Sequence, residues 1–451
     1  MPVPGGIAQA DSMKYRNVHS SKVGSGKAGN RVTVNVTFTQ FKLENGLTVI
    51  LRKDSSAPVV AVDVCYHVGS KNEKKGKTGF AHLFEHLMFE GSEHVKKGEF
   101  DRYISLAGGY NNAYTTEDVT NYYEVLPSNQ LALALWLESD RMLKFGVTEE
   151  AFSTQREVVK EEKRWRVDNR PYGNTMERLQ QLVFPAGQYH WPVIGSMEDL
   201  DAAGMNDVRE FYERYYVPDN AVLVLSGNIN EGEAENLVRR YFSDIPPGPK
   251  PVGQLAFEDR PIDGEVTDTL KGDVPAPAVF AAYKVPPEGS HEYYELGNVA
   301  KILSDGNSSR LYKRLVYDIQ AVSEFEVSIE GMEKAGIFLF SAFVAPGHSE
   351  EEVLAIFDEE IAKIKGSMVT PYEFEKSRNS TLFSYAGRLS ANSGVADALA
   401  HYQSIFNDAG MINSEVGREL AVTRESLRGV ASDLLVKENR VVITYYPSDH
   451  A

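Results

Sequence analysis

Four prolines fall within seven residues near the middle of this chain, at Ile245–Pro251. Neither a helix nor a central strand accommodates such a run, because proline lacks the backbone N–H and restricts the backbone. We therefore predict a linker over residues 245–263. It separates an N-terminal domain, residues 32–244, from a C-terminal domain, residues 264–451.

The segments on the two sides of this linker follow the same order of strand, loop, helices and final strand. In the first half the patterns predict strands at 32–36, 41–51 (a hairpin around Asn45-Gly46), 59–68 and 221–226, and helices at 78–89, 131–145, 149–167 and 205–216. In the second half they predict strands at 278–285 and 440–446 and a helix at 293–304. This repetition favours an α+β fold with two homologous domains, each a mostly antiparallel sheet covered by helices.

The composition is that of a globular protein, with 42% hydrophobic and 25% charged residues among 451. A formal charge of −17 argues against nucleic acid as a partner, because such binding rests on clustered Lys and Arg. No apolar run approaches the ~20 residues of a membrane span. The single cysteine, Cys65, lies in an apolar run and is interpreted as a core residue.

Residues 1–31 are predicted to be a disordered leader, because Gly, Ser and Lys are frequent and hydrophobic periodicity is absent. Ala8-Gln9-Ala10 has the small-x-small form of a signal-peptidase site, but no apolar region precedes it. The compartment therefore stays open between bacterial periplasm and cytoplasm.

The segment Gly79–Phe89 carries the pattern with the clearest chemical meaning, His82-x-x-Glu85-His86 on an amphipathic helix. Histidines four residues apart lie on one helical face and can direct two imidazole nitrogens at one metal ion. Zinc binds neutral imidazoles in a tetrahedral site and leaves a position for water. Glu85 shares the face and can accept a proton from that water, so we predict Glu85 as the catalytic base. The alternative is a helix with two ordinary histidines and a surface glutamate. That arrangement would bury polar groups without partners, which is unfavourable.

A third ligand is needed, and the spacing within this motif does not supply one. The helix at 152–167 carries the adjacent glutamates Glu161 and Glu162. Its run Arg156–Arg164 is dense in charge. On composition alone this helix is a solvated, charged one.

The order of these motifs resembles the pitrilysin family of inverted-zincin metallopeptidases, which includes insulin-degrading enzymes and the mitochondrial processing peptidase. The His82–His86 helix, the segment Gly108–Thr115 and the helix with Glu161-Glu162 follow one another as in that family. The similarity extends from about residue 32 over nearly the whole chain and is greatest to the family's short branch. It implies one Zn²⁺ per chain held by His82, His86 and Glu162, and a fold that forms half of a clam-like chamber. Glu161, one residue off in register, is the competing candidate for the third ligand, because only one of two adjacent helix positions can face the site.

The resemblance also assigns a substrate-binding role to Asn112, Ala113 and Thr115. In the family this strand pairs with the backbone of the peptide substrate, which gives affinity with little demand on sequence. On the residues alone, Gly109–Thr115 reads as an extended edge strand, and a core strand flanked by turns is the alternative.

Two departures from the family pattern bear on function. Many relatives support the site with a glutamate seven residues before the ligand, where this chain has Gln155. Active relatives carry an Arg and, seven residues later, a Tyr that hold the substrate carbonyl, and these positions align with Val316 and Ser323 here. The chain thus resembles the zinc-carrying half of an enzyme whose homologous second subunit supplies that pair, although a homodimer is also compatible.

These features predict a zinc-dependent endopeptidase that cleaves unfolded peptides or short polypeptides, as the metal-carrying subunit of a heterodimer. The alternative is a non-catalytic structural subunit, like the core proteins of respiratory complexes that resemble this family. Such proteins typically have eroded metal motifs, whereas His82, Glu85, His86 and Glu162 are all present here.

Overall fold

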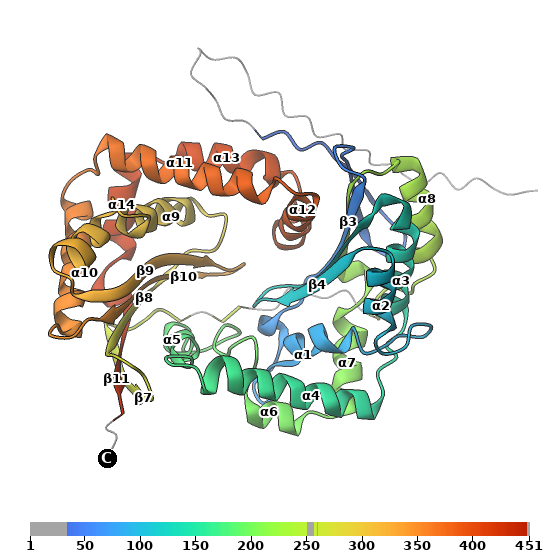
Figure 1. Ribbon diagram of the computed structural model, residues 1–451, viewed down its shortest axis with the longest axis horizontal. Helices are drawn as coiled ribbons and strands as arrows, with labels where there is room; N and C mark the ends of the chain where they lie inside the picture. Colours follow the sequence, from blue (N-terminus) through green and yellow to red (C-terminus); the bar gives the residue numbers. More distant parts are fainter. Residues whose placement is uncertain (1–33, 250–256, 259, 449–451) are drawn as a thin grey trace, which may run out of the picture.

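The computed structural model describes residues 34–249, 257, 258 and 260–448, so the predicted leader at 1–31 lies outside the described residues. Two sheets, one from each half of the chain, lie on opposite sides of Figure 1, each with helices against it. The predicted α+β class with two helix-covered sheets is confirmed.

The first sheet has the strand order β1-β2-β6-β3-β5-β4. Its strands are β1 (Thr39–Lys42), β2 (Thr48–Lys53), β3 (Val59–Tyr66), β4 (Tyr110–Thr115), β5 (Thr120–Pro127) and β6 (Ala221–Gly227). The β2–β6 pair is parallel, and the other pairs are antiparallel. Strand β3 is almost wholly apolar because both of its faces are buried, with Val62 and Val64 on one side and Ala61 and Cys65 on the other.

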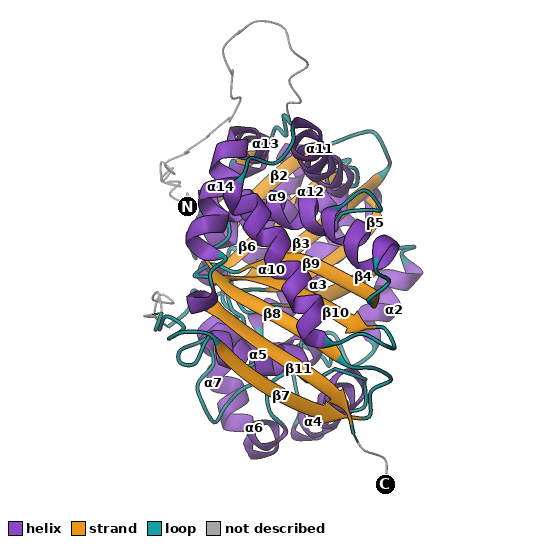
Figure 2. Cartoon of the chain, turned by 90° about the vertical axis from the view of Figure 1, so that its left-hand side faces the viewer, coloured by secondary structure: helices purple, strands orange, loops and turns teal. Residues whose placement is uncertain are grey.

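The second sheet has the order β7-β11-β8-β10-β9 and crosses the view in Figure 2. Its strands are β7 (Val266–Gly272), β8 (Ala278–Val285), β9 (Val322–Gly331), β10 (Gly336–Val344) and β11 (Arg440–Pro447). Here β7 and β11 are parallel, and the remaining pairs are antiparallel. Without β1, the first sheet has the same order and the same strand directions, which agrees with the repeat predicted from the sequence.

Helices cover both sheets. The first half contributes α1 (Phe80–Leu87), α2 (Glu99–Leu106), α3 (Leu131–Leu143), α4 (Glu149–Lys163), α5 (Thr175–Val183), α6 (Met197–Ala202), α7 (Met205–Tyr215) and α8 (Glu231–Phe242). The second contributes α9 (His291–Ser304), α10 (Glu350–Gly366), α11 (Pro371–Arg388), α12 (Asn392–Phe406), α13 (Met411–Ala421) and α14 (Arg424–Leu434). Among the described residues, none of these helices is long and apolar enough to cross a bilayer.

One strand prediction was wrong. Within the described part of the segment predicted as a strand at 32–36, residues 34–36 form no strand, and the first strand begins at Thr39. The alternating valines lie against the second half instead. The Val36 N–H donates to Asn413 Oδ1 (2.7 Å), and Asn413 Nδ2 donates to the Val36 carbonyl (2.9 Å). A side chain of α13 thus satisfies the backbone that a neighbouring strand would otherwise pair with.

The two halves exchange a helix. Helix α12, from the second half, packs on β3 and β6 of the first sheet, where Val395 and Leu399 join the apolar cluster on the face turned towards the second half (Figure 1). Helix α5, from the first half, packs on β8 and β11 of the second sheet through Leu179 and Val183. Each sheet is therefore covered on one face by a helix from the other half of the chain.

A buried polar network joins the β4–β5 turn to the β9–β10 turn. The Lys71 ammonium, in a side chain that is 9% exposed, pairs with Asp118 Oδ1 at 2.9 Å and also with Glu333. Asp118 Oδ2 accepts a hydrogen bond from the Glu333 N–H (2.8 Å). Separating the partners of a buried ion pair is unfavourable, because each would be left as an uncompensated charge. These contacts therefore fix the end of β4 relative to the end of β9.

A carboxyl group under α12 gives the fold a pH dependence. Asp63, on β3, is 1% exposed, and burial, followed by the nearby charge of Asp397 on α12, raises the pKa of this carboxyl well above its usual value. A raised carboxyl pKa means that the folded state disfavours the ionised form. Its contribution to stability is therefore greatest in acid and is lost as the pH rises through the folded pKa.

We expect Asp63→Asn to raise the melting temperature by a few degrees at pH 8 and by less at pH 5, because asparagine stays neutral. The amide can still accept the hydrogen bond that Asn121 Nδ2 gives to Asp63 Oδ2 (3.1 Å). Calorimetry of both proteins across this pH range measures the difference. A gain that is equal at both pH values would contradict the titration of Asp63.

Candidate metal centre

Helix α1 is anchored so that one face is free for polar groups. Phe80, Leu83, Phe84 and Leu87 are buried in the first core. Gly79 begins the helix at φ +85°, and a Cβ there would lie 2.7 Å from a backbone oxygen, so glycine is required. The buried Glu73 carboxylate accepts hydrogen bonds from the N–H groups of Gly79 (2.9 Å) and Ala81 (2.8 Å). His82, Glu85 and His86 occupy the remaining face.

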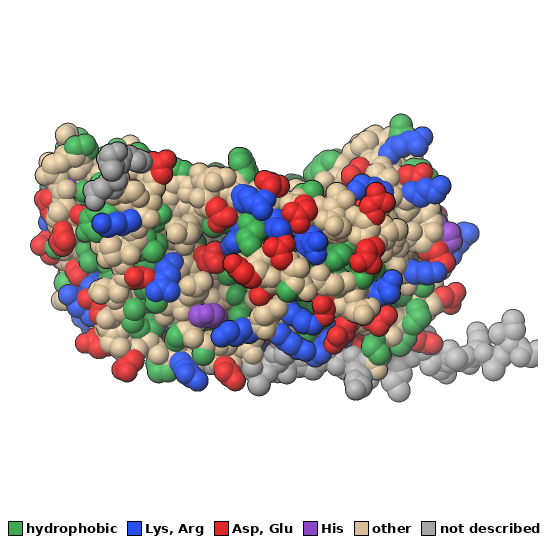
Figure 3. All heavy atoms as spheres, turned by 90° about the horizontal axis from the view of Figure 1, so that it is seen from below, with side chains coloured by type: hydrophobic (Ala, Val, Ile, Leu, Met, Phe, Trp, Pro, Cys, Tyr) green, Lys and Arg blue, Asp and Glu red, His purple; other side chains and the backbone are tan. Residues whose placement is uncertain are grey.

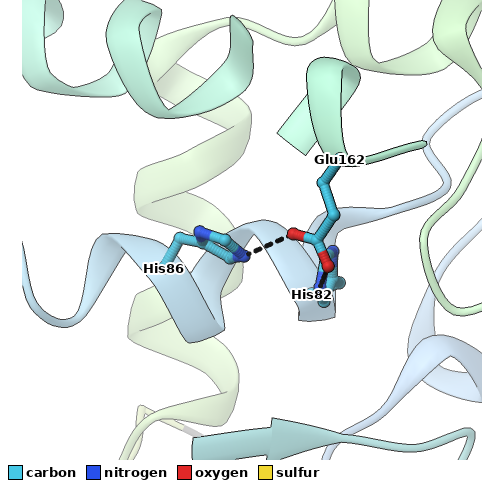
Figure 4. A group of neighbouring side chains, drawn as sticks. All are labelled: His82, His86 and Glu162. Carbon is cyan, nitrogen blue, oxygen red and sulfur yellow. Dashed lines mark ion pairs between the residues drawn. The ribbon is translucent and has the colours of Figure 1, made fainter. Parts of the chain in front are cut away.

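The two histidines of α1 meet a carboxylate from α4. His86 Nε2 lies 3.3 Å from Glu162 Oε2, and His82 Nε2 lies 3.7 Å from Glu162 Oε1. Figure 4 shows both imidazoles directed at the Glu162 carboxylate, which descends from the neighbouring helix. Among the described residues, this is the one group of three His, Cys, Asp or Glu side chains whose donor atoms all lie within 4.8 Å of one another.

This cluster fits zinc in both chemistry and spacing. Ligand atoms 2.0–2.2 Å from a tetrahedral ion lie about 3.3–3.6 Å from one another, close to the two nitrogen–oxygen distances. Burial, and then the charge of His86, holds the pKa of His82 well below its usual value. The hydrogen bond with His86 lowers the pKa of Glu162. A neutral imidazole and an ionised carboxylate are the forms that bind metal.

Glu85 lies beside the cluster and is held by strand β4. Its Oε2 accepts a hydrogen bond from Thr115 Oγ1 at 2.7 Å. Burial raises the pKa of Glu85, against the opposing effect of that hydrogen bond. A carboxylate whose pKa is shifted towards neutrality accepts and returns a proton more readily than an exposed one.

The three residues predicted to bind substrate lie on β4, the edge strand of the first sheet, paired with β5. The Ala113 N–H donates to Asn112 Oδ1 at 2.9 Å. Thr115 differs from the expectation in one respect, because its hydroxyl is engaged by Glu85. It thus connects the edge strand to the predicted catalytic base.

The two adjacent glutamates of α4 point in different directions. The Glu161 side chain is 71% exposed and pairs with Arg164, whereas that of Glu162 is 16% exposed and faces the histidines. Figure 3 shows the outer face of this region, where acidic and basic side chains are interspersed, as expected of a solvated surface. The helix is therefore charged on the outside, as its composition suggested, and directs a single carboxylate inward.

We expect Glu162→Gln to weaken zinc affinity far more than Glu161→Gln, because only Glu162 faces His82 and His86. Isothermal titration of zinc into both metal-free variants measures the difference. Equal losses would contradict the assignment, and a larger loss in the Glu161 variant would move the ligand by one residue.

The positions that depart from the family pattern make contacts with residues outside the cluster. Gln155 Nε2 donates to Glu90 Oε1 (2.7 Å). Val316 packs against the second core, and the exposed Ser323 donates weakly to the Phe343 carbonyl (3.4 Å).

Sequence reasoning missed two residues that act on the site. Glu73 caps α1, and no sequence pattern indicated this. Arg166 Nη1 lies 2.9 Å from Glu162 Oε1, and its spacing of four residues after Glu162 on a helix was a usable signal.

Comparison with known proteins agrees with this geometry. The family model described as insulinase (peptidase family M16) matches residues 48–193, and the one described as peptidase M16 inactive domain matches residues 203–381. The zinc protease PqqE of Helicobacter pylori is 31% identical over 367 residues, which is 80% of this chain and 82% of that protein. The chain belongs to peptidase family M16. The predicted membership of the pitrilysin group is thereby confirmed.

Other proteins and solved structures are also similar to this M16 protein. The mitochondrial-processing peptidase subunit beta of Blastocladiella emersonii is 28% identical over 234 residues, 52% of this chain and 50% of that one. The crystal structure of a protease from Helicobacter pylori has a TM-score of 0.87 at 29% identity, over 92% of this chain and 100% of that chain. An M16-like peptidase from Alicyclobacillus acidocaldarius, at 18% identity, shares the fold with a TM-score of 0.81, over 92% of this chain and 100% of that chain.

Proposed function

We propose that this M16 protein is a zinc-dependent endopeptidase acting on unfolded peptides or short polypeptides. The observation that carries the proposal is the meeting of His82, His86 and Glu162 beside Glu85. Relatives named zinc proteases support the same chemistry. Zinc bound by these three ligands would polarise the scissile carbonyl and acidify a water molecule.

The residues of the chain would then act one after another during the reaction. The extended substrate would lie along the edge of β4 and form backbone hydrogen bonds there, a mode of binding open only to an unfolded segment. Glu85 takes the proton of the attacking water and delivers it to the departing amine nitrogen. Thr115 keeps the Glu85 carboxylate oriented during both transfers.

We further propose that the active form pairs this chain with a homologous subunit. Val316 and Ser323 cannot supply the guanidinium and phenol donors that the family uses to hold the substrate carbonyl. One relative is itself named as a subunit, the beta subunit of mitochondrial-processing peptidase. A partner that carries the Arg/Tyr pair would complete the site, and a homodimer is the alternative.

A non-catalytic subunit is the competing function. A chain of Complex III2 from Candida albicans shares the fold with a TM-score of 0.75 at 15% identity, over 90% of this chain and 95% of that chain. The intact cluster of three ligands around Glu85 favours catalysis, because a purely structural role would not maintain it.

Zinc content tests the proposal directly. We expect about one zinc ion per chain by elemental analysis, and loss of that ion in His82→Ala and in His86→Ala. His291→Ala is the matched control, because this imidazole is 57% exposed on α9 and pairs only with Glu295 among the described residues. Full zinc retention in both α1 variants would refute the metal site. Zinc binding without cleavage of any unfolded peptide, even with a homologous partner, would favour the structural subunit.

A further inference from the structure

The Glu162 carboxylate has one cationic partner besides the two histidines among the described residues. Arg166 Nη1 lies 2.9 Å from Glu162 Oε1. Arg166 belongs to the segment Arg164–Asp168, which continues α4 with wider, π-helical turns. The Arg166 side chain is 62% exposed, so its guanidinium approaches the site from the solvent side.

We propose that Arg166 is a positioning residue that orients the Glu162 carboxylate for metal binding, an inference that rests on the proposed zinc site. A glutamate side chain has several freely rotating bonds, and ordering it opposes metal binding. A guanidinium bound to one carboxylate oxygen restricts that rotation and leaves the other oxygen directed at the metal. In this structure Oε1 lies 2.9 Å from Arg166 Nη1 and 3.7 Å from His82 Nε2, while Oε2 faces His86 at 3.3 Å.

A second position that could support the Glu162 carboxylate is engaged elsewhere. Gln155 occupies the place of the supporting glutamate found in many relatives, and its amide is bonded to Glu90. Glu90, whose side chain is 8% exposed, is in turn paired with Lys97 at 2.6 Å, so the Gln155 amide is engaged by a carboxylate other than Glu162. Support for Glu162 therefore comes from the C-terminal side of α4, through Arg166.

The chain offers a matched pair for comparison. Arg164 pairs with Glu161 within the same turn, but Glu161 is 71% exposed and lies outside the ligand cluster. The two arginines have the same charge and a similar distance in sequence from their glutamates. They differ in whether the glutamate faces the histidines, which separates an effect on the site from a general effect on helix stability.

The test is zinc affinity measured by competition with a chelator, together with the rate of zinc release. We expect Arg166→Gln to weaken zinc affinity about 10- to 100-fold, which is the usual effect of losing a hydrogen-bond partner of a metal ligand. Arg166→Lys should fall between the wild type and Arg166→Gln, because an ammonium keeps the charge but not the planar geometry. Arg164→Gln should bind zinc as the wild type does, and the melting temperature of the zinc-free protein should be unchanged in all three variants.

The outcomes separate this inference from the proposed site. If Glu162→Gln loses zinc while Arg166→Gln binds it as tightly as the wild type, or more tightly, the role of Arg166 is overturned and the zinc site stands. Equal weakening by Arg166→Gln and Arg164→Gln would also overturn it. Absence of zinc from the wild type would overturn both.

Discussion

Replacing Glu85 with glutamine is expected to lower peptide hydrolysis by about 100- to 10,000-fold, because the amide cannot accept the proton of the attacking water. The zinc content should not change, since Glu85 is not among the three clustered ligands. Glutamine has nearly the same shape as glutamate and can still accept the hydrogen bond from Thr115 Oγ1. The fold should therefore be retained.

Turnover of an internally quenched peptide and zinc content, measured on the same preparation, check this prediction. Glu161→Gln is the appropriate control, because it makes the same chemical change on the exposed side of α4. Retained hydrolysis in the Glu85 variant would remove this residue from the mechanism. Loss of zinc in that variant would indicate that Glu85 has a role in metal binding.

The isolated chain, loaded with zinc, is expected to be a poor peptidase. Negative charge develops on the substrate carbonyl oxygen during attack, and loss of one preorganised donor typically lowers the rate about 100- to 1000-fold. Val316 and Ser323 stand at both expected donor positions. Zinc should still bind, because all three ligands come from the first half of the chain.

Cleavage should be measured at a concentration where sedimentation defines the state of association. Adding a homologous subunit with the Arg/Tyr pair should restore turnover, and mutating that pair in the partner should abolish it again. Full activity without a partner would show that the chain has its own donors. Tyr317, whose side chain is 77% exposed next to Val316, would then be the first residue to replace with phenylalanine.

The elements that were predicted correctly from the sequence are those whose residue pattern follows directly from their own burial. The buried strands β3, β6, β8 and β11 are continuous apolar runs because both of their faces are covered, and their bounds agree with the prediction within two residues. Residues 34–36 also alternate, but the Asn413 side chain takes the backbone hydrogen bonds of Val36, and a single sequence does not reveal such a distant partner.

Part of the candidate site could also be predicted from the sequence, and part could not. Spacing alone placed His82, Glu85 and His86 on one face of α1, because that relation is fixed by helix geometry. The choice between Glu161 and Glu162 depends on the rotation of α4 about its axis relative to α1, which is a tertiary property. The approach of Thr115 to Glu85 likewise needed the packed structure, whereas the spacing of four residues between Glu162 and Arg166 was a local signal.

The exchanged helices have a consequence for the integrity of the molecule. Since α12 completes the burial of the first sheet and α5 that of the second, each half supplies part of the other's hydrophobic core. A protease that cut the chain between α8 and β7 would leave two fragments held together by the packing of α12 and α5. If the fragments separated, each sheet would expose to water the apolar face that the other fragment's helix covers.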